Sequence, residues 1–396
     1  MGDKREIKYI YGKSADNLLS LTLILCLLGP GIQFTLNALF GYGFNLFLVE
    51  AGVFMLFVIT LLKGGCGLKV NNNIFTAIFV GIIYFLSLLI SNSSDTTVFL
   101  GDFIRNCSII VVVLMFRINY QLVFNQAKWV AVFDVVLIEI MLIVHNAAII
   151  DYMTFGFHFM FALSFLFLYC YERRNIIGLC VCCVMCMQML TYSARSNWYM
   201  TAILFLILLF GYTKRKATKI CGSVLIIIGL FYYNQLLNAI LNFLATNFSA
   251  TTYAVRNLQR MLLATNASDI LGRRSDIYSM AITAMQEHPF GMGVGGFSSS
   301  YALYPHNLFF DIWITFGMFF GTALIVYLFY IVVMAFRANG DSVYKFLMTW
   351  SLINFSRLLT THTFVCEPVF FLVVCLSING LQRRQCDDNG INTYIQ

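Results

Sequence analysis

The sequence predicts an all-α protein that crosses a lipid bilayer many times, and two observations support this prediction. Of the 396 residues, 60% are hydrophobic and only 11% are charged, whereas soluble domains average about 45–50% apolar and about 25% charged residues. A globular core of this size could not bury so much apolar surface, so the surrounding solvent must be lipid. In addition, apolar runs of about 17–25 residues, the length that spans the hydrocarbon core as a helix, recur along the chain.

These runs predict about twelve membrane spans, and one connection between them is far longer than the rest. The expected limits of the spans are 18–39, 44–62, 74–91, 98–116, 129–149, 155–171, 175–190, 197–212, 219–234, 318–336, 343–360 and 364–381. The long connection covers residues 235–306, between the ninth and tenth spans. We therefore expect one integral membrane domain over residues 1–396, with a single large loop.

The basic residues predict the orientation of the spans. When the N-terminus is placed in the cytoplasm, every lysine and most of the arginines fall in cytoplasmic loops, as the positive-inside rule requires. Both termini are then cytoplasmic, and the large loop faces outward. The net charge of +7 is thus a topology signal, and it does not indicate nucleic-acid binding, which needs a basic patch on a soluble face.

The large loop contains a helical pattern, which argues against disorder. The pattern begins after Ser275 and Asp276 and ends before Pro289. Its apolar residues at helical spacing are Ile277, Met280, Ala281, Ala284 and Met285. Loops longer than about 12–15 residues are usually functional or disordered, so we expect a small helical cap over the outer mouth of the bundle.

The basic residues in the outward loops are all arginines, and they predict an anion site. Arg273 and Arg274 open the helix of the large loop, where the positive end of the helix dipole adds to their charge. Arg195 lies in another outward turn, and Arg256 and Arg260 share one face of a second helical stretch. Guanidinium groups suit bidentate phosphate binding. The alternative is a set of solvated side chains.

A glycine cluster follows the predicted helix. Residues 291–296, GMGVGG, match the dinucleotide-binding pattern G-x-G-x-x-G. That site requires a preceding strand, and here a helix and Pro289 come first, so we reject it. Gly291 and Gly293 are instead expected in a turn whose bare backbone could approach a phosphate or a sugar. The alternative is a plain turn between two helices.

His306 stands between Pro305 and Asn307 at the end of the large loop. With an ordinary pKa near 6.5, an imidazole can act as a base close to neutral pH. The alternative is a hydrogen-bonded anchor at the membrane interface. The apolar segment that follows is too long to belong to the next span, so we expect a short interfacial or re-entrant helix that turns at Gly317.

Ionisable residues inside membrane spans are functional candidates. Most of those in the predicted spans fall toward the outer half, so we expect a polar cavity beneath the large loop; they are Glu50, Asp102, Arg105, Glu139, His145, Arg357 and Glu367. We expect no metal site. The cysteines of residues 180–186 lie in an apolar span without polar partners, and the large loop has no acidic cluster.

Several short motifs occur in an order that resembles the O-antigen polymerase and ligase superfamily. Gly272 and Arg273 open the loop helix, His288-Pro289 and the two glycines Gly291 and Gly293 follow it, and His306-Asn307 precede Gly317 and Gly321. The resemblance covers residues 190–325, and it includes Arg195. Two departures are Ala194, where some relatives have a hydroxyl residue, and the doubled arginine after Gly272.

The resemblance implies a glycosyltransferase of the bacterial inner membrane, with a fold similar to the lipid-donor (GT-C-like) class. Its donor and acceptor would be glycans linked to undecaprenyl diphosphate and exposed on the periplasmic side. We expect Arg195 and Arg273 to hold the diphosphate in place of a metal ion. We expect His306 to deprotonate, or at least to orient, the acceptor hydroxyl in a single inverting displacement. Further substrate-binding candidates are Arg274, Arg256, Arg260, Gly291, Gly293 and Asn307.

The acceptor decides between two reactions. A polymerase joins lipid-linked repeat units, whereas a ligase transfers the glycan to lipid A–core. The short separation along the sequence between the glycine turn and His306 resembles polymerases more than ligases, so we favour the polymerase. The resemblance also implies contact with membrane lipids and a chain-length regulator as partner. A transporter of lipid-linked glycans is a non-enzymatic alternative, but transporters usually have repeat-related halves, and here the polar signals gather in one loop.

Overall fold

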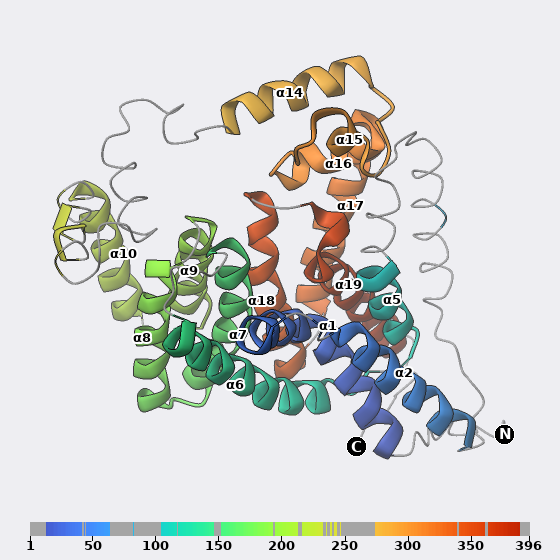
Figure 1. The fold of residues 1–396 in the computed structure, drawn as a ribbon, viewed down its shortest axis with the longest axis horizontal. Coiled ribbons are helices and arrows are strands. Elements are labelled where there is room, and N and C mark those ends of the chain that lie inside the picture. Colours follow the sequence, from blue (N-terminus) through green and yellow to red (C-terminus); the bar gives the residue numbers. More distant parts are fainter. Residues whose placement is uncertain are drawn as a thin grey trace.

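The computed structural model describes residues 13–41, 43, 45–63, 82, 104–116, 118–145, 152–192, 195–212, 216–232, 235, 238–239, 241–243, 246, 274–338, 340–360 and 363–388. These residues form helices and short turns, and there is no strand among them (Figure 1). The all-α prediction is confirmed for this part of the chain.

The first half of the chain contributes the helices α1 (Lys13–Phe40), α2 (Leu46–Lys63), η1 (Ile104–Ser108), α5 (Ile109–Leu114), α6 (Tyr120–His145), α7 (Tyr152–Glu172), α8 (Ile176–Tyr192), α9 (Arg195–Ile207), η2 (Leu208–Tyr212) and α10 (Lys216–Phe231). Most match a predicted span. The third predicted span lies outside the described residues apart from Ile82. Helix α6 begins well before residue 129, because its first turns are polar and hydropathy alone does not register them.

The second half contributes α14 (Arg274–Glu287), α15 (Gly296–Tyr301), α16 (Leu308–Phe316), α17 (Met318–Ala338), α18 (Ser342–Phe355), η3 (Ser356–Leu359), η4 (Phe364–Cys366) and α19 (Pro368–Asp388). The predicted span 343–360 is shorter than expected, because α18 ends at Phe355 and continues as the 3-10 helix η3. Helix α19 starts at Pro368, a residue suited to the first position of a helix.

Several helices are apolar enough to lie in a membrane. Within the described part of the chain, four helices meet the length and composition of a span, namely Ser14–Phe40, Leu46–Lys63, Phe155–Glu172 and Met318–Arg337. In the first and third of these, 67% of the apolar window is buried, against 17% in the last. Helices α1 and α7 are therefore central, while α17 exposes aromatic side chains such as Phe319 and Phe329, as a lipid-facing helix does.

An aromatic cluster holds α18 against α6 and α7. The ring of Phe165 makes edge contacts with Phe346 and Trp350, and Phe124 contacts Phe346 at 4.9 Å between centroids. Such pairs contribute about 0.5–1.5 kcal/mol each beyond the burial of their area. The Trp350 indole also donates a 3.0 Å hydrogen bond to the carbonyl of Phe161. These contacts fix the helix whose C-terminal end lies next to the cap.

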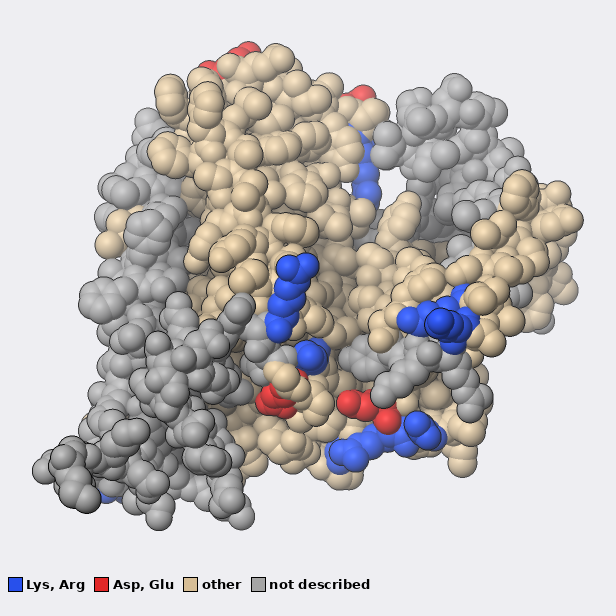
Figure 2. Space-filling view, turned by 180° about the vertical axis from the view of Figure 1, so that it is seen from behind, with Lys and Arg blue, Asp and Glu red and all other residues tan. Residues whose placement is uncertain are grey.

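Helices α14 to α16 form a layer at one end of the bundle, above α17 in Figure 1. We call residues 274–317 the cap. Ile277, Ala281, Ala284 and Met285 form the buried face of α14, as predicted, whereas Met280 is 37% exposed. In Figure 2, which shows the back of the molecule, most of the visible charged side chains lie in the lower half, away from the cap.

Candidate active site

The glycine cluster docks its backbone onto the joint between α16 and α17. Met292 N–H donates to the carbonyl of Ile314 at 2.7 Å, and Gly293 N–H donates to that of Thr315 at 3.2 Å. Gly291 has φ +95°, and a Cβ there would lie 2.5 Å from the Thr315 carbonyl oxygen. The glycines are therefore required by a close approach of two backbone segments and by left-handed conformations.

This docking changes what the glycines can offer a ligand. Gly291 N–H donates to the carbonyl of His288 at 2.9 Å, and Gly293 N–H is occupied by Thr315. Neither amide is available to a phosphate oxygen in this conformation. Helix α14 precedes the cluster, so the structure also lacks the preceding strand that a dinucleotide site would need. A substrate-binding role for the two glycines stays a prediction.

His306 is held in a strained turn at the start of α16. Its φ of +52° lies in the left-handed region, which non-glycine residues rarely adopt. The next residue, Asn307, is the N-cap of α16, and its side-chain oxygen accepts from Phe309 N–H at 2.9 Å and Phe310 N–H at 3.4 Å. This gives Asn307 a structural role, and its predicted contact with substrate stays a prediction. These N-cap hydrogen bonds of Asn307 fix the backbone next to His306.

The imidazole of His306 is half-buried and carries a nitrogen without a partner. Its Nδ1 atom is buried and has no hydrogen-bond partner among the described residues. Burial, and then the positive charge of Arg274, lower the pKa of His306 below its ordinary value. The ring is therefore neutral near pH 7, as a general base must be. Arg274 is the first residue of α14, so the structure brings this predicted cation into electrostatic range of His306.

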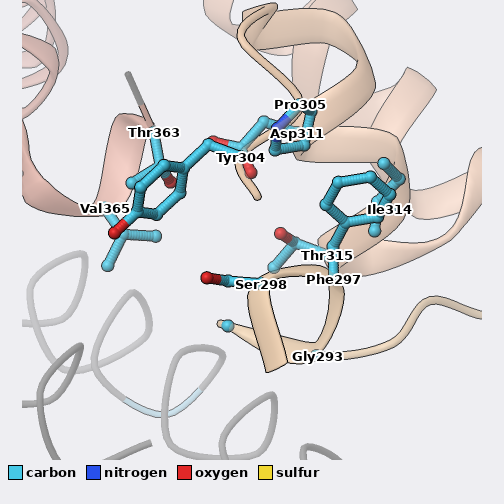
Figure 3. A pocket seen from close by; sticks show the side chains of 11 residues that line it. Gly293, Phe297, Ser298, Tyr304, Pro305, Asp311, Ile314, Thr315, Thr363 and Val365 are labelled. Atoms are coloured by element: carbon cyan, nitrogen blue, oxygen red, sulfur yellow. The ribbon is translucent and has the colours of Figure 1, made fainter. Parts of the chain in front are cut away.

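A small cavity lies between α15, α16 and the link from α18 to α19, and its wall includes Tyr304 and Pro305, the two residues before His306 (Figure 3). It offers about 10 Å³ to the centres of water-sized atoms, which is the room of about one water molecule. The cavity is lined by Gly293, Gly295, Phe297, Ser298, Tyr304, Pro305, Asp311, Ile314, Thr315, Thr363 and Val365. The rings of Tyr304 and His306 lie 6.4 Å apart between centroids.

Asp311 is a buried acid of this cavity that sequence reasoning missed. The residue is 7% exposed, and its Oδ2 accepts a 3.0 Å hydrogen bond from Phe364 N–H. Burial raises the pKa of Asp311 to about 6, although hydrogen bonds from Thr363 and Phe364 act in the opposite direction. A single acid in the apolar segment 308–316 was the available signal. The hydrogen bonds tie the segment that carries His306 to the link between α18 and α19.

One segment of the chain matches a known protein family. Residues 178–326 match the family model described as O-Antigen ligase. The chain carries an O-antigen ligase family domain. This domain is shared by O-antigen polymerases and O-antigen ligases, which transfer lipid-linked glycans. The resemblance expected from the motifs is thus confirmed, while comparison with curated proteins and with solved structures gave no match.

The O-antigen ligase family domain runs from α8 into α17, so it contains Arg195, Arg274, the glycine turn and His306. Arg195 begins α9, and only its backbone is described. Arg273, Arg256 and Arg260 lie outside the described residues. The structure therefore places Arg274 and His306 in one region, and the arrangement of the other predicted arginines stays a prediction.

A buried ion pair lies beyond the family domain, in the link between α18 and α19. The guanidinium group of Arg357 pairs with the carboxylate of Glu367, and both side chains are buried. The Arg357 guanidinium carbon also lies 4.9 Å from the ring centre of Phe157. Arg357 lies in η3, which continues α18, and Glu367 directly precedes Pro368, the first residue of α19. Their place inside membrane spans stays a prediction. Helix α16 contacts η3 and η4.

Two of the remaining ionisable candidates, Glu50 and Glu139, lie on different helices. Glu50 is buried on α2, and Glu139 on α6 accepts a 3.0 Å hydrogen bond from Gln188 on α8. Asp102 lies outside the described residues, and only the backbone is described for Arg105 and His145. Among the described residues, no group of three or more His, Cys, Asp or Glu side chains could hold a metal ion.

Proposed function

We propose that this protein is an O-antigen polymerase of the bacterial inner membrane. It would join repeat units linked to undecaprenyl diphosphate, on the periplasmic face, with both termini of the chain in the cytoplasm. The family domain supports the use of lipid-linked glycans. The observation that carries the proposal is the half-buried His306, which precedes the N-cap of α16, has a buried Nδ1 without a partner among the described residues, and lies within electrostatic range of Arg274.

His306 acts as the general base in this proposal. The acceptor hydroxyl oxygen attacks the anomeric carbon of the donor sugar, and its proton passes to the neutral imidazole. The bond between that carbon and the diphosphate oxygen breaks, and undecaprenyl diphosphate leaves with the electron pair. A single displacement inverts the configuration at the anomeric carbon. General-base catalysis requires a base that is held in place. The left-handed backbone at His306 and the N-cap hydrogen bonds of Asn307 hold the imidazole in this way.

Arginines stabilise the departing diphosphate. Arg274 lies at the N-terminus of α14, where the helix dipole is positive, and its charge already acts on His306. This proximity favours Arg274 as one of the cations that face the donor, together with Arg195 and Arg273. Fixed guanidinium groups stabilise a developing oxyanion by several kcal/mol, about 3–4 where one donor has been removed in other enzymes, so the mechanism does not depend on a metal ion.

The O-antigen ligase reaction is the second candidate, and the description of the matching family favours it. Donor, base and arginines are the same in both reactions, and only the acceptor differs. We favour the polymerase because the glycine turn and His306 are close in sequence and pack on the same helix, α16. A partner that sets the length of the polymer belongs to this proposal.

The proposal is tested in cells that express His306→Gln or Arg274→Gln, at matched protein levels, by a ladder gel of the lipopolysaccharide. A polymerase defect leaves lipid A–core capped by a single repeat unit. A ligase defect leaves uncapped core while lipid-linked polymer accumulates. Arg337→Gln is the control, because Arg337 is exposed in the last turn of α17, far from the cap. A normal ladder from both site variants would overturn the assignment of the site.

A further inference from the structure

The cavity between α15, α16 and the link from α18 to α19 is lined by hydroxyl groups that point into it. Ser298 and Thr315 lie on one side, and the ring of Tyr304 lies on the other, beside Thr363 and Val365 (Figure 3). Neither the Ser298 nor the Thr315 hydroxyl is hydrogen-bonded to another described residue. Buried or half-buried hydroxyl groups normally find a partner. Two hydroxyls that share a cavity without one are thus open to a polar group from outside the protein.

The cavity differs from an anion site in its charge. Asp311 contributes a buried carboxyl group to the wall, and Thr363 donates a hydrogen bond to it. The guanidinium group within range of His306 belongs to α14, whose residues do not line the cavity. A carboxyl group repels phosphate but accepts a hydrogen bond from a hydroxyl. This separates the cavity from the place where a diphosphate would lie.

The size of the cavity limits what it can hold. With about 10 Å³ open to the centres of water-sized atoms, it admits one small polar group but not a whole sugar ring. The aromatic rings of Phe297 and Tyr304 form the apolar part of the wall. Together, hydroxyl groups, one carboxyl group and aromatic rings match the edge of a sugar, which has hydroxyl substituents on an apolar ring.

We propose that this cavity, which we call the hydroxyl pocket, binds one hydroxyl or hydroxymethyl substituent of the acceptor sugar and thereby selects the acceptor. The proposal rests on the proposed function, because it assigns the acceptor side of the same site. Tyr304 and Pro305 line the pocket and directly precede His306. A substituent held here would place a neighbouring hydroxyl of the same sugar next to the imidazole. The pocket is thus a specificity element, and His306 remains the base.

Removal of a hydroxyl from the hydroxyl pocket should change KM but not kcat. The protein is purified into lipid nanodiscs and supplied with lipid-linked glycan extracted from host cells that lack this protein. Ser298→Ala and Thr315→Val each remove one hydroxyl while they keep most of the side-chain volume. We expect each to raise KM about 3- to 10-fold, the effect of one neutral hydrogen bond, with kcat within about twofold of the original. The double variant should raise KM further than either single variant.

Matched controls separate this effect from a general disturbance. Ser299 is the exposed neighbour of Ser298, and the Ser299 hydroxyl donates to the Gly295 carbonyl, so Ser299→Ala is one control. Thr283→Val, at an exposed threonine of α14, is the other. Both should keep the original KM. Thr315→Ser, which retains the hydroxyl, should restore a KM close to the original.

Two results would overturn the hydroxyl pocket. One is an unchanged KM in both Ser298→Ala and Thr315→Val. The other is a loss of kcat or of folded protein at constant KM, which would assign the hydroxyls to a structural water. Either result leaves the proposed function standing if His306→Gln still abolishes turnover. Full turnover by His306→Gln would instead remove the proposed function itself.

Discussion

At the scale of single residues, His306 and Asp311 have pKa values that burial moves in opposite directions. The pKa of His306 is lowered by burial and by Arg274, so the imidazole stays neutral near pH 7. The pKa of Asp311 is raised by burial to about 6. Both shifts have the same physical cause, because burial disfavours the charged form of each group. Each shift leads to a prediction that does not depend on the identity of the sugar.

The Arg274 charge should be visible in the pH dependence of turnover. A base with a lowered pKa remains active at lower pH, and activity falls as the pH drops through that pKa. Arg274→Gln removes one of the two causes of the shift. We expect the acidic limb of the kcat/KM profile to move to higher pH, in addition to any loss of rate. An acidic limb that stays at the same pH in this variant, as in the control Arg337→Gln, would show that Arg274 does not act on His306.

Asp311 should make folding less favourable as the pH rises. A carboxyl group whose pKa is higher in the folded than in the unfolded protein binds its proton more tightly when folded, so stability falls between about pH 4 and about pH 6. Asp311→Asn removes this titration. At pH 7 the variant should have a higher melting temperature than the original protein, and its free energy of unfolding should be larger by on the order of 1–3 kcal/mol. Below pH 4 the two melting temperatures should converge. A difference in melting temperature that does not change with pH would show that Asp311 is not a buried carboxyl group with a raised pKa.

The sequence contained a clear signal for His306 but only a weak one for Asp311. His306 follows a proline and precedes an N-cap asparagine and an apolar helix, all of which are local features. The partner of Asp311 is the backbone of Phe364, in a link between two other helices. Periodicity does not reveal such a distant contact, so a buried acid in a short helix looks like any polar interruption of an apolar run.

At the scale of secondary structure, the cap depends on a close contact between two glycine positions. A Cβ at Gly317 would lie 2.6 Å from the carbonyl oxygen of Pro289, and Gly317 has φ +80°. The glycine turn and the joint between α16 and α17 can therefore meet only without side chains. The cap helices α14 and α16 could be predicted from capping residues and apolar spacing. The docking of the turn could not, because the pattern G-x-G-x-x-G says nothing about its partner.

Gly317→Ala should therefore loosen the cap. The added methyl group meets backbone atoms and forces an unfavourable conformation, so we expect a loss of about 1–3 kcal/mol in stability, together with reduced turnover. Gly340→Ala is the control, because Gly340 has open space around the position of a Cβ. Thermal unfolding of both variants in nanodiscs provides the comparison. Equal melting temperatures for the two variants would contradict the docking of the turn.

At the scale of the whole molecule, hydropathy predicted most of the helices and the large cap, because both depend on composition over many residues. The twelve spans themselves stay a prediction, and the four helices that meet the criteria of a span include the central α1 and α7. The meeting of α15, α16 and the link from α18 to α19 at one cavity depends on packing between distant segments. None of the ionisable residues expected to form a polar cavity beneath the large loop lines this cavity, so that expectation stays a prediction.

The proposed function requires His306 to act as the base for glycosyl transfer from a lipid diphosphate. The most direct measurement counts the undecaprenyl diphosphate released by purified protein in nanodiscs, against the glycosidic linkages formed from extracted lipid-linked glycan. The original protein should release one undecaprenyl diphosphate for each linkage, and His306→Gln should bind the donor but release almost none. Release and linkage formation at the original rate in His306→Gln would contradict the account.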